Sequence, residues 1–280
     1  MSASARRRDE GPAADDRAAG LPDLRWFAPG THITVRGLEK SFDGNPVYVG
    51  FDIDLPKGKI VSVFGPNGCG KSTFINMVSG LMPIDRGQIL FEGKTIGETR
   101  IGYVFQNYRE ALFPWLRAID NIHYPLKLMG VPKAERSRRI EALAAGFDLK
   151  FDLHRYPYQM SGGQQQTVSI MRSLVIDPEV LFLDEPFSAL DYEMTLIMRD
   201  QLQKVLAGRG TTTVLVSHDL EEAVYLADKL LMLTRRPSRI AEFIDIDLPR
   251  PRTPATLSEP GFVALKARAL DVFQTSVRDS

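Results

Sequence analysis

A glycine-rich loop between an apolar run and a helical pattern constrains this chain more than any other stretch. The loop, residues 65–73, reads G-x-x-x-x-G-K-S, a pattern that wraps around phosphate groups. Residues 60–64 before it are apolar and rich in β-branched side chains, which indicates a buried strand. Residues 74–81 after it carry apolar side chains at helical spacing, with Gly80 and Pro83 as stop signals. Strand, loop and helix in this order predict a site for a nucleoside triphosphate.

The chemistry of this loop follows from its residue types. Glycines let the backbone bend so that successive N–H groups point at a phosphate chain, and the helix that follows adds its positive end. We expect Lys71 to reach the β- and γ-phosphates of ATP and the Ser72 hydroxyl to complete a Mg²⁺ shell. The expected nucleotide-binding set is Gly65, Pro66, Asn67, Gly68, Cys69, Gly70, Lys71, Ser72 and Thr73.

Composition limits the classes of protein to which this loop could belong. The chain has 280 residues, 44% of them hydrophobic, which is enough for a large core. Basic and acidic residues number 35 each, and a formal charge of zero argues against a broad nucleic-acid footprint. The single cysteine, Cys69, excludes an intrachain disulfide and fits a reducing compartment. We expect its thiol to pack inertly, the alternative being a low-pKa thiolate beside the helix N-terminus.

The two ends of the chain differ from its middle in amino-acid composition. The arginines at positions 6–8 are not followed by an apolar region, so residues 1–30 are predicted to be a disordered tail rather than a secretory signal. Residues 247–280 are predicted to be a proline-rich linker followed by a short amphipathic helix from Phe262 to Phe273. No stretch approaches the ~20 apolar residues of a membrane span.

Polar side chains follow the ends of several predicted apolar strands. A carboxylate such as Asp184, at the tip of a strand beside the phosphate loop, is placed to hold Mg²⁺. The next residue, Glu185, could orient or deprotonate an attacking water, and a pair of merely solvated acids is the alternative. Such strands, separated by helices, predict a mostly parallel sheet with ligands at its carboxyl ends. The strands are residues 101–105 (delivering Gln106), 180–183 (Asp184 and Glu185), 211–216 (His218) and 230–233.

Three other segments leave two interpretations open. Residues 31–49 are typical of antiparallel strands, and Phe42 within them could stack on an adenine ring or pack in the core. Residues 107–117 mix aromatic and charged side chains, which suits either a partner surface or a packed surface loop. Ser161 before a predicted helix is a plausible N-cap, and the glycines after it could form a second anion site.

Taken together, these motifs resemble those of the ATP-binding subunit of ATP-binding-cassette (ABC) transporters. The match spans residues 31–236 and contains the family's motifs in order. Its specific part is the signature at residues 161–164, which separates this family from the kinases, GTPases and helicases that share the phosphate loop. The motifs are the phosphate loop, Gln106, the signature Ser161-Gly162-Gly163-Gln164, the acids Asp184-Glu185, the stretch Ser188-Ala189-Leu190-Asp191, and His218.

The resemblance implies an α/β fold of the P-loop NTPase (RecA-like) class with a mostly parallel sheet. An N-terminal antiparallel β subdomain and an inserted α-helical signature subdomain, about residues 107–176, would complete an ATPase domain over residues 31–246. Phe42 stands where the family has the aromatic residue that stacks on adenine, which favours stacking over core packing.

The resemblance also implies roles for the site residues. Two subunits would face each other head to tail as a homodimer, with two ATP molecules between them. One subunit would supply Lys71, Gln106, Glu185 and His218 for catalysis and Ser72, Gln106 and Asp184 for Mg²⁺. The other would cover the γ-phosphate with Ser161, Gly162, Gly163 and Gln164 and approach it through Asp191.

Residues 105–122 and 156–163 are similar to those of importers of nitrate, sulfonate, taurine and bicarbonate. In such a system the 107–117 loop would contact a transmembrane permease, and a periplasmic solute-binding protein would act as a separate chain. The protein would then lie peripherally on the cytoplasmic face of the inner membrane, with no nucleic-acid partner.

Other functions within and outside transport remain as alternatives. An efflux or lipid-trafficking ABC ATPase would keep the same active site and change only the direction of transport. A soluble, non-transport ABC protein usually has two cassettes or a long coiled-coil insertion, and neither is visible. An inactive regulatory binder is disfavoured because Lys71, Glu185 and His218 are all present.

Two positions depart from the usual sequence of the family. Thr167 stands where an arginine usually follows the signature, and residues 171–174 read M-R-S-L where the family normally reads A-R-A-L. Neither position contacts ATP in the family. We therefore expect the departures to affect helix anchoring or partner contact rather than activity.

Overall fold

The structure, a computed structural model, describes residues 29–107 and 111–278. The predicted disordered tail therefore lies outside the described residues except for residues 29 and 30. Three residues of the 107–117 loop, 108–110, are also outside them. Among the residues that the structure describes, no helix has the length and apolar character needed to cross a membrane.

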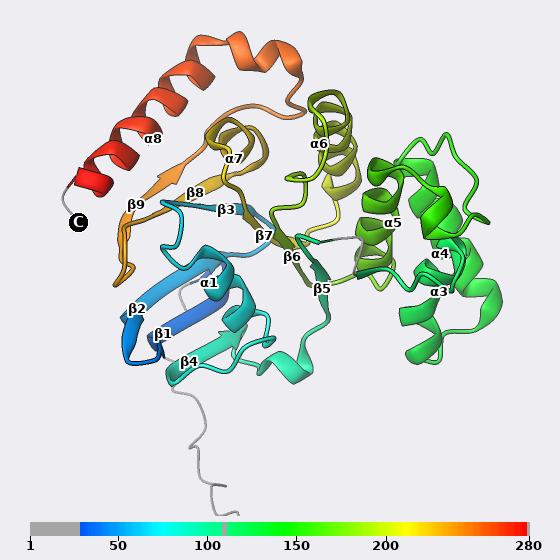
Figure 1. Ribbon diagram of the computed structural model, residues 1–280, viewed down its shortest axis with the longest axis horizontal. Coiled ribbons are helices and arrows are strands. Elements are labelled where there is room, and N and C mark those ends of the chain that lie inside the picture. Colours follow the sequence, from blue (N-terminus) through cyan, green and yellow to red (C-terminus); the bar gives the residue numbers. More distant parts are fainter. Residues whose placement is uncertain (1–28, 108–110, 279–280) are drawn as a thin grey trace, which may run out of the picture.

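A six-stranded sheet lies at the centre of the molecule (Figure 1), with strand order β5-β6-β7-β3-β8-β9. All neighbouring strands are parallel except the edge pair β8–β9, which is antiparallel. The five parallel strands confirm the predicted sheet, whereas β9 was not predicted. The strands are β3 (Ile60–Phe64), β5 (Ile101–Val104), β6 (Val180–Asp184), β7 (Thr212–Val216), β8 (Lys229–Leu233) and β9 (Ile240–Asp245).

The central strand β3 shows how this sheet is buried on both faces. All five of its residues are buried, and successive side chains enter different cores. Val61 and Val63 belong to a core shared with the antiparallel sheet, whereas Ile60 and Phe64 belong to a core shared with the helices of the other face. Alternation of this kind requires apolar side chains on both faces of a strand, which is why the run reads as continuously hydrophobic.

The second sheet is antiparallel and has the order β2-β1-β4, confirming the predicted β subdomain. Its first two strands, β1 (Thr31–Phe42) and β2 (Asn45–Pro56), form one long hairpin closed by Asp43 and Gly44. Both turn residues have positive φ, 50° and 79°, as expected for an Asp-Gly hairpin turn. The third strand is β4 (Arg86–Phe91), and together with α1 (Lys71–Val78) this sheet covers one face of the central sheet.

A helical subdomain stands beyond the β5–β6 end of the central sheet (Figure 1, green). It contains α3 (Ala118–Leu128), α4 (Lys133–Gly146) and α5 (Gly162–Leu174), and a short 3₁₀ turn at Pro157–Gln159 leads into α5. Apolar side chains of all three helices join the core on that side of the molecule. Helices α6 (Tyr192–Leu206) and α7 (Leu220–Leu226) follow β6 and β7.

The C-terminal helix α8 (Pro260–Arg278) has 19 residues and is longer than the short helix predicted over 262–273. It continues because buried Ser276, four residues after Val272, carries the inward stripe that includes Ala269 and Val272 past the predicted end. The helix packs on the domain, as expected: Phe273 lies 5.4 Å from Phe64 between ring centroids, and Phe262 is fully buried.

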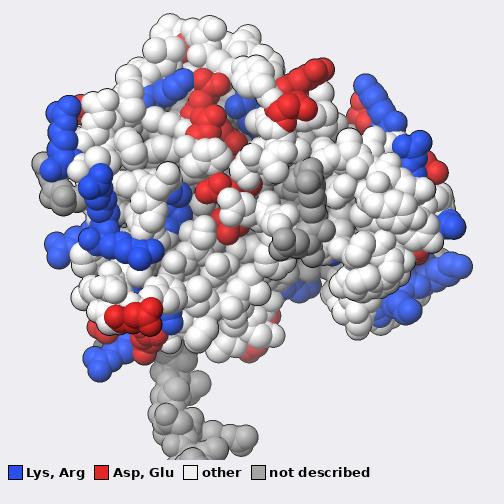
Figure 2. Space-filling model, in the orientation of Figure 1, with Lys and Arg blue, Asp and Glu red and all other residues white. Residues whose placement is uncertain are grey.

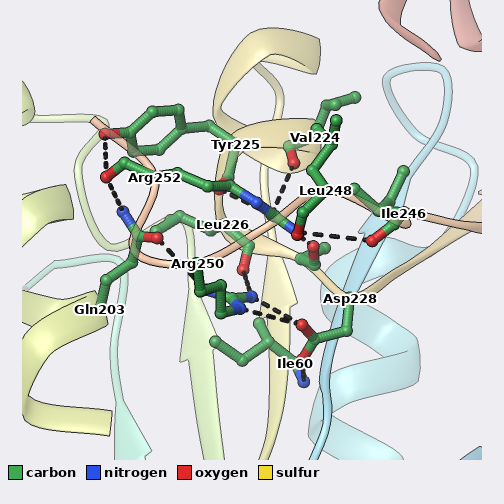
Figure 3. A network of polar contacts seen from close by, with 11 residues as sticks. Ile60, Gln203, Val224, Tyr225, Leu226, Asp228, Ile246, Leu248, Arg250 and Arg252 are labelled. Atoms are coloured by element: carbon green, nitrogen blue, oxygen red, sulfur yellow. Dashed lines mark hydrogen bonds and ion pairs between the residues drawn. The ribbon is translucent and has the colours of Figure 1, made fainter. Parts of the chain in front are cut away.

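The predicted linker before α8 is tied to the domain by two arginines (Figure 3). Arg252 is 2% exposed, and its guanidinium donates to the carbonyl oxygens of Val224, Tyr225 and Ala227 at the end of α7. Arg250 donates to the carboxylate of Asp228 at 2.9 Å. These bonds satisfy carbonyl groups that a helix end leaves without intrahelical partners. The segment is therefore a fixed strap rather than a free linker.

Candidate functional site

The phosphate loop joins β3 to α1, as predicted, and is enclosed by neighbouring backbone. Gly70 has φ 114°, and a Cβ there would lie 2.7 Å from a methyl carbon of Val47. The Tyr48 hydroxyl donates to the Gly70 carbonyl at 3.0 Å, and the Ser238 hydroxyl donates to the Cys69 carbonyl. The strained geometry and the close contacts explain why glycine is needed at position 70.

Two side chains of the loop are almost fully buried. The Lys71 ammonium donates to the carbonyl oxygens of Gly65 at 2.9 Å and Pro66 at 3.3 Å, so its charge is held at the mouth of the loop. Burial raises the pKa of the Cys69 thiol, although the Lys71 charge opposes this change. A raised pKa contradicts the low-pKa thiolate alternative and supports inert packing of Cys69.

The predicted metal ligands Ser72 and Asp184 lie together. Ser72 at the start of α1 donates from its hydroxyl to Oδ1 of Asp184 at 3.2 Å. Asp184, at the end of β6, is 7% exposed; burial raises its pKa, and the Ser72 hydrogen bond partly offsets this. A hydroxyl and one carboxylate are hard oxygen ligands of the kind that Mg²⁺ takes together with phosphate oxygens and water. The donor set therefore fits Mg²⁺ bound to a nucleotide.

Described residues contain no group of three or more His, Cys, Asp and Glu side chains that could hold a metal by themselves. The third predicted ligand, Gln106, is directed elsewhere: its Nε2 donates to Glu185 at 3.1 Å. The protein thus places two oxygen ligands beside the loop, and a nucleotide would have to provide others.

Three predicted catalytic residues meet at one carboxylate. Oε2 of Glu185 accepts the hydrogen bond from Gln106 and lies 3.0 Å from Nδ1 of His218. These side chains follow β5, β6 and β7, which are neighbours in the sheet. Glu185 has φ 44°, a left-handed conformation that is uncommon for a non-glycine residue, and its N–H donates to the Val216 carbonyl. A strained backbone held by the next strand fixes the direction of the Glu185 side chain.

The signature residues lie in the helical subdomain, at the start of α5. Ser161 is the N-cap, as predicted: its hydroxyl accepts from the Gln164 N–H at 3.3 Å, and the Gln164 side chain accepts from the Ser161 N–H at 3.1 Å. Asp191 caps α6 by accepting from the Met194 N–H at 2.8 Å. A Cβ at Gly163 would lie 2.3 Å from Met194, so the two helix starts pack together.

The structure therefore brings the predicted site residues into two separate groups. The loop, Gln106, Asp184, Glu185 and His218 form one group at the carboxyl ends of the sheet strands. The signature and Asp191 form the other group, and within the described residues no hydrogen bond joins the signature to the phosphate loop. Gly162 is the first residue of α5. N–H groups in the first turn of a helix can donate hydrogen bonds to a bound anion.

Phe42 lies at the end of β1 and is 39% exposed, so the core-packing alternative is wrong. The Lys40 ammonium lies 5.4 Å from the centroid of its ring. The hairpin that carries Phe42 also carries Val47 and Tyr48, which contact the phosphate loop. An exposed ring on this hairpin can stack on a base.

The loop that was predicted to meet a partner carries an exposed aromatic cluster. Trp115 is 70% exposed and lies 5.5 Å from Phe113 between ring centroids, and Phe113 also contacts Tyr124. Buried Asn121 holds the loop in place, because its side chain bonds to the N–H and carbonyl of Phe113. An anchored loop that exposes a tryptophan has the composition of a binding surface.

Several functional neighbours were not identified from the sequence. The Tyr103 hydroxyl lies 2.7 Å from the Asn76 side-chain oxygen and 3.4 Å from Asp184, and burial raises the pKa of Tyr103. Gln166 donates to the carbonyl of Pro186, which directly follows Glu185. Tyr103 carries a hydroxyl group within an otherwise apolar strand. That hydroxyl is the one signal in the sequence that could have indicated a polar role for Tyr103.

The two departures from the family sequence have structural roles. The buried Thr167 hydroxyl donates to the carbonyl of Gly163 at 2.9 Å, inside the first turn of α5. In the second stretch, the Ser173 hydroxyl donates to the Tyr103 carbonyl of β5 at 2.7 Å, and Met171 is fully buried. Both departures therefore act on the anchoring of α5, as expected.

The chain is similar to known proteins over most of its length. The family model described as "ABC transporter" matches residues 48–188. An uncharacterized ABC transporter ATP-binding protein of Methanocaldococcus jannaschii is 36% identical over 255 residues, covering 89% of this chain and 93% of that protein. A taurine import ATP-binding protein of Escherichia coli O157:H7 is 35% identical, covering 85% of this chain and 95% of that protein.

Among solved structures, the chain resembles a dimeric ATP-binding cassette, MJ0796, bound to ADP and phosphate. The TM-score is 0.65 at 24% identity, with 78% of this chain and 100% of that chain covered. At this identity the likeness shows the fold alone, and it agrees with the predicted P-loop NTPase architecture.

Proposed function

This chain belongs to the ABC transporter family as an ATP-hydrolysing, ATP-binding subunit, and on that premise we propose that it drives the import of a small anion through a membrane permease. The hydrolytic part of the proposal rests mainly on one observation, the convergence of Gln106 and His218 on a single oxygen of Glu185. The import part is supported by the likeness to import proteins. Nitrate, sulfonate and taurine are examples of the solute class, since a taurine import protein is among the relatives.

Glu185 is the proposed general base. Its carboxylate oxygen would accept a proton from the water that attacks the γ-phosphorus of ATP, which forms the new P–O bond as the bond to ADP breaks. Gln106 and His218 hold this oxygen from two sides and so fix its direction. Lys71 would place its charge against the β- and γ-phosphates, where negative charge develops.

Ser72 and Asp184 are the proposed ligands of Mg²⁺. When bound, Mg²⁺ would neutralise charge on the phosphate oxygens. Gln106, also predicted as a ligand, would have to leave Glu185 to take that role, because its amide nitrogen is bonded there. Phe42 is the proposed platform for the adenine ring, supported by its exposure on the hairpin whose Val47 and Tyr48 contact the loop.

A second copy of the chain is the proposed source of the missing half of each site. Ser161, Gly162, Gly163 and Gln164 present a capped helix start with free N–H groups, and Asp191 lies on the neighbouring helix start. Facing the γ-phosphate of a partner's ATP, these groups would stabilise negative charge from the open side. The MJ0796 cassette with the same fold is described as dimeric.

The exposed cluster around Trp115 is the proposed contact with the permease. An importer would place the protein at the cytoplasmic face of the membrane, with a periplasmic solute-binding protein acting through the permease rather than by direct contact. An efflux or lipid-trafficking role is the alternative, and it would keep the same active site and change only the direction of transport.

Co-purification tests this proposal directly. The full chain, expressed with its neighbouring genes, is expected to purify with a multi-span membrane protein, and a solute-binding protein is expected to stimulate its ATPase activity in the reconstituted complex. ATPase activity that needs no membrane partner and gains nothing from one would contradict the transport role. Stimulation by solute from the cytoplasmic side alone would contradict import.

A further inference from the structure

Away from the phosphate loop, a pocket lies between the β8–β9 hairpin and helix α8. Its cavity volume is about 730 Å³, within the range of small-molecule sites. Arg235, Arg236 and Arg239 line it from the hairpin, and Asp271 and Val272 line it from α8. On the face drawn in Figure 2, Lys and Arg side chains gather at the left, over the region where Figure 1 places β9 and the end of α8.

The three arginines of the hairpin are exposed. None of their guanidinium groups makes an ion pair or hydrogen bond with any residue in the described part of the chain. Glu242, the acid nearest in sequence, is already paired with Arg268 of α8. Three like charges close together repel one another, and an anion with several oxygens would relieve that repulsion. Guanidinium groups match phosphate through paired hydrogen bonds.

The rest of the pocket wall limits the kind of anion. The Thr275 hydroxyl can bond to a polar ligand, while Pro237 and Val272 offer apolar surface. The Thr234 hydroxyl is already used within the hairpin, where it donates to the Arg235 carbonyl and accepts from the Arg239 N–H. The Asp271 carboxylate would repel phosphate but accept a hydrogen bond from a hydroxyl or amino group. The wall therefore suits a ligand with phosphate at one end and a hydroxyl-bearing organic group at the other.

The basic hairpin is also in direct contact with the back of the phosphate loop. Ser238, between two of the arginines, donates from its hydroxyl to the Cys69 carbonyl and from its N–H to the Val47 carbonyl at 2.7 Å. At the end of β8, the Leu233 carbonyl lies 2.8 Å from where a Cβ of Gly65 would be. A ligand bound by the arginines would thus hold the residues on either side of Ser238, the residue that contacts the phosphate loop.

We propose that this pocket binds a soluble organic phosphate of metabolite size and that its occupancy changes the affinity of the phosphate loop for nucleotide. The two sites share the hairpin, so coupling between them acts in both directions: nucleotide bound at the loop changes the affinity of the pocket by the same factor.

Titration calorimetry with inorganic pyrophosphate as the probe tests the pocket. The full chain is first saturated with ADP and Mg²⁺, so that the phosphate loop is filled. We expect one pyrophosphate per chain, bound roughly tenfold or more weakly after the double substitution Arg235→Ala and Arg239→Ala, because charge-assisted hydrogen bonds are lost. Asp271→Asn is expected to bind pyrophosphate more tightly, since a repelling charge is removed.

Arg86→Ala is the matched control, because it removes an exposed arginine on β4 with only a distant ion pair. It is expected to bind pyrophosphate as the unchanged protein does, and thermal melting checks that all variants fold. The proposed pocket would be overturned if pyrophosphate did not bind, or if all variants bound it equally. It would also be overturned if the protein bound only vesicles that contain phosphatidylglycerol.

Coupling has its own readout, which is separate from the transport proposal. Pyrophosphate is expected to change the Kd for ADP by a few-fold in the unchanged protein and to leave it unchanged in the double arginine variant. Pyrophosphate binding with no effect on ADP affinity would overturn the regulatory part. Neither measurement depends on a permease or on hydrolysis.

Discussion

The phosphate-loop group and the signature group of the candidate site are built in different ways. The first is held by the central sheet: Lys71 and Asp184 are buried, and Glu185 is held from two sides by Gln106 and His218. The second, at residues 161–164 and 191, is formed by exposed helix starts whose hydrogen bonds are local caps. One group is ready to bind a nucleotide within a single chain, whereas the other can act only on something brought to it.

We propose that this difference separates two steps: the binding of nucleotide by one chain, and the approach of a second chain to that nucleotide. We propose that ATP affinity belongs to the first group, because a prearranged loop needs little rearrangement to take ATP. In the same proposal, the second group is brought to the γ-phosphate by a partner chain and stabilises it from the open side. The predictions below test this division, beginning with the largest expected effect.

Glu185→Gln removes the proposed base and keeps the shape of the side chain. We expect ATP hydrolysis to fall by roughly 10² to 10⁴, the usual contribution of general base catalysis. ATP affinity is expected to change little, because Lys71 and the loop are intact. Steady-state ATPase assays and nucleotide binding by fluorescence measure the two effects. Glu141→Gln, an exposed acid on α4, is the matched control, and near-normal turnover of Glu185→Gln would remove Glu185 from this role.

Ser161→Asp keeps the helix cap but adds negative charge at the signature. Aspartate caps helices as well as serine does, so α5 should remain stable. We expect hydrolysis to fall by about a hundredfold, because the added charge opposes the γ-phosphate, while ATP binding to the isolated chain is unchanged. Ser161→Thr serves as the control. Weakened ATP binding by the isolated Ser161→Asp chain would mean that the signature belongs to the same half-site as the loop.

Trp115→Ala removes the exposed aromatic of the proposed permease contact. Basal ATPase activity should stay within about twofold, whereas affinity for the permease should fall roughly 30-fold, as expected for an interface hot spot of ~2 kcal/mol. Pull-down with the permease in detergent measures this. Val49→Ala, an apolar side chain 59% exposed on β2, is the control. An equal loss for both variants would show that Trp115 has no special role.

Glu222→Gln should change the pH dependence of stability. Burial raises the pKa of Glu222 to about 7 from the ordinary 4.5. A carboxyl whose pKa is raised by folding stabilises the protein fully below pH 4.5, and that stabilisation is lost as the pH rises through 7. The unchanged protein should therefore lose stability between these pH values, at about 1.4 kcal/mol for each pKa unit of difference, and the variant should not. Urea unfolding at several pH values measures this, and parallel curves would contradict the assignment.

Motif residues and the parallel strands could be predicted from the sequence for a physical reason. Strands such as Ile60–Phe64 are buried on both faces, so their apolar character is continuous and visible. Gln106, Asp184 and His218 were found because they follow such strands directly, and parallel strands end at one edge.

Other features depend on contacts that local patterns do not contain. Strand β9 is only partly buried, with an Ile-Ala-Glu-Phe-Ile-Asp pattern too weak to stand out. Ser238 meets Cys69 across 169 positions of sequence, and Arg252 meets the end of α7 from a segment that looks like a linker. Such contacts follow from how the elements pack, which spacing alone does not reveal.

Mixing two inactive variants tests most directly whether the two groups complement each other between chains. Lys71→Ala lacks the loop charge, and Ser161→Asp has a blocked signature. A mixed dimer of the two contains one site with both defects and one intact site, so an equal mixture should recover up to about a quarter of the unchanged ATPase activity. If both groups acted within the same chain, every site in the mixture would carry a defect. No recovered activity on mixing would therefore contradict the account.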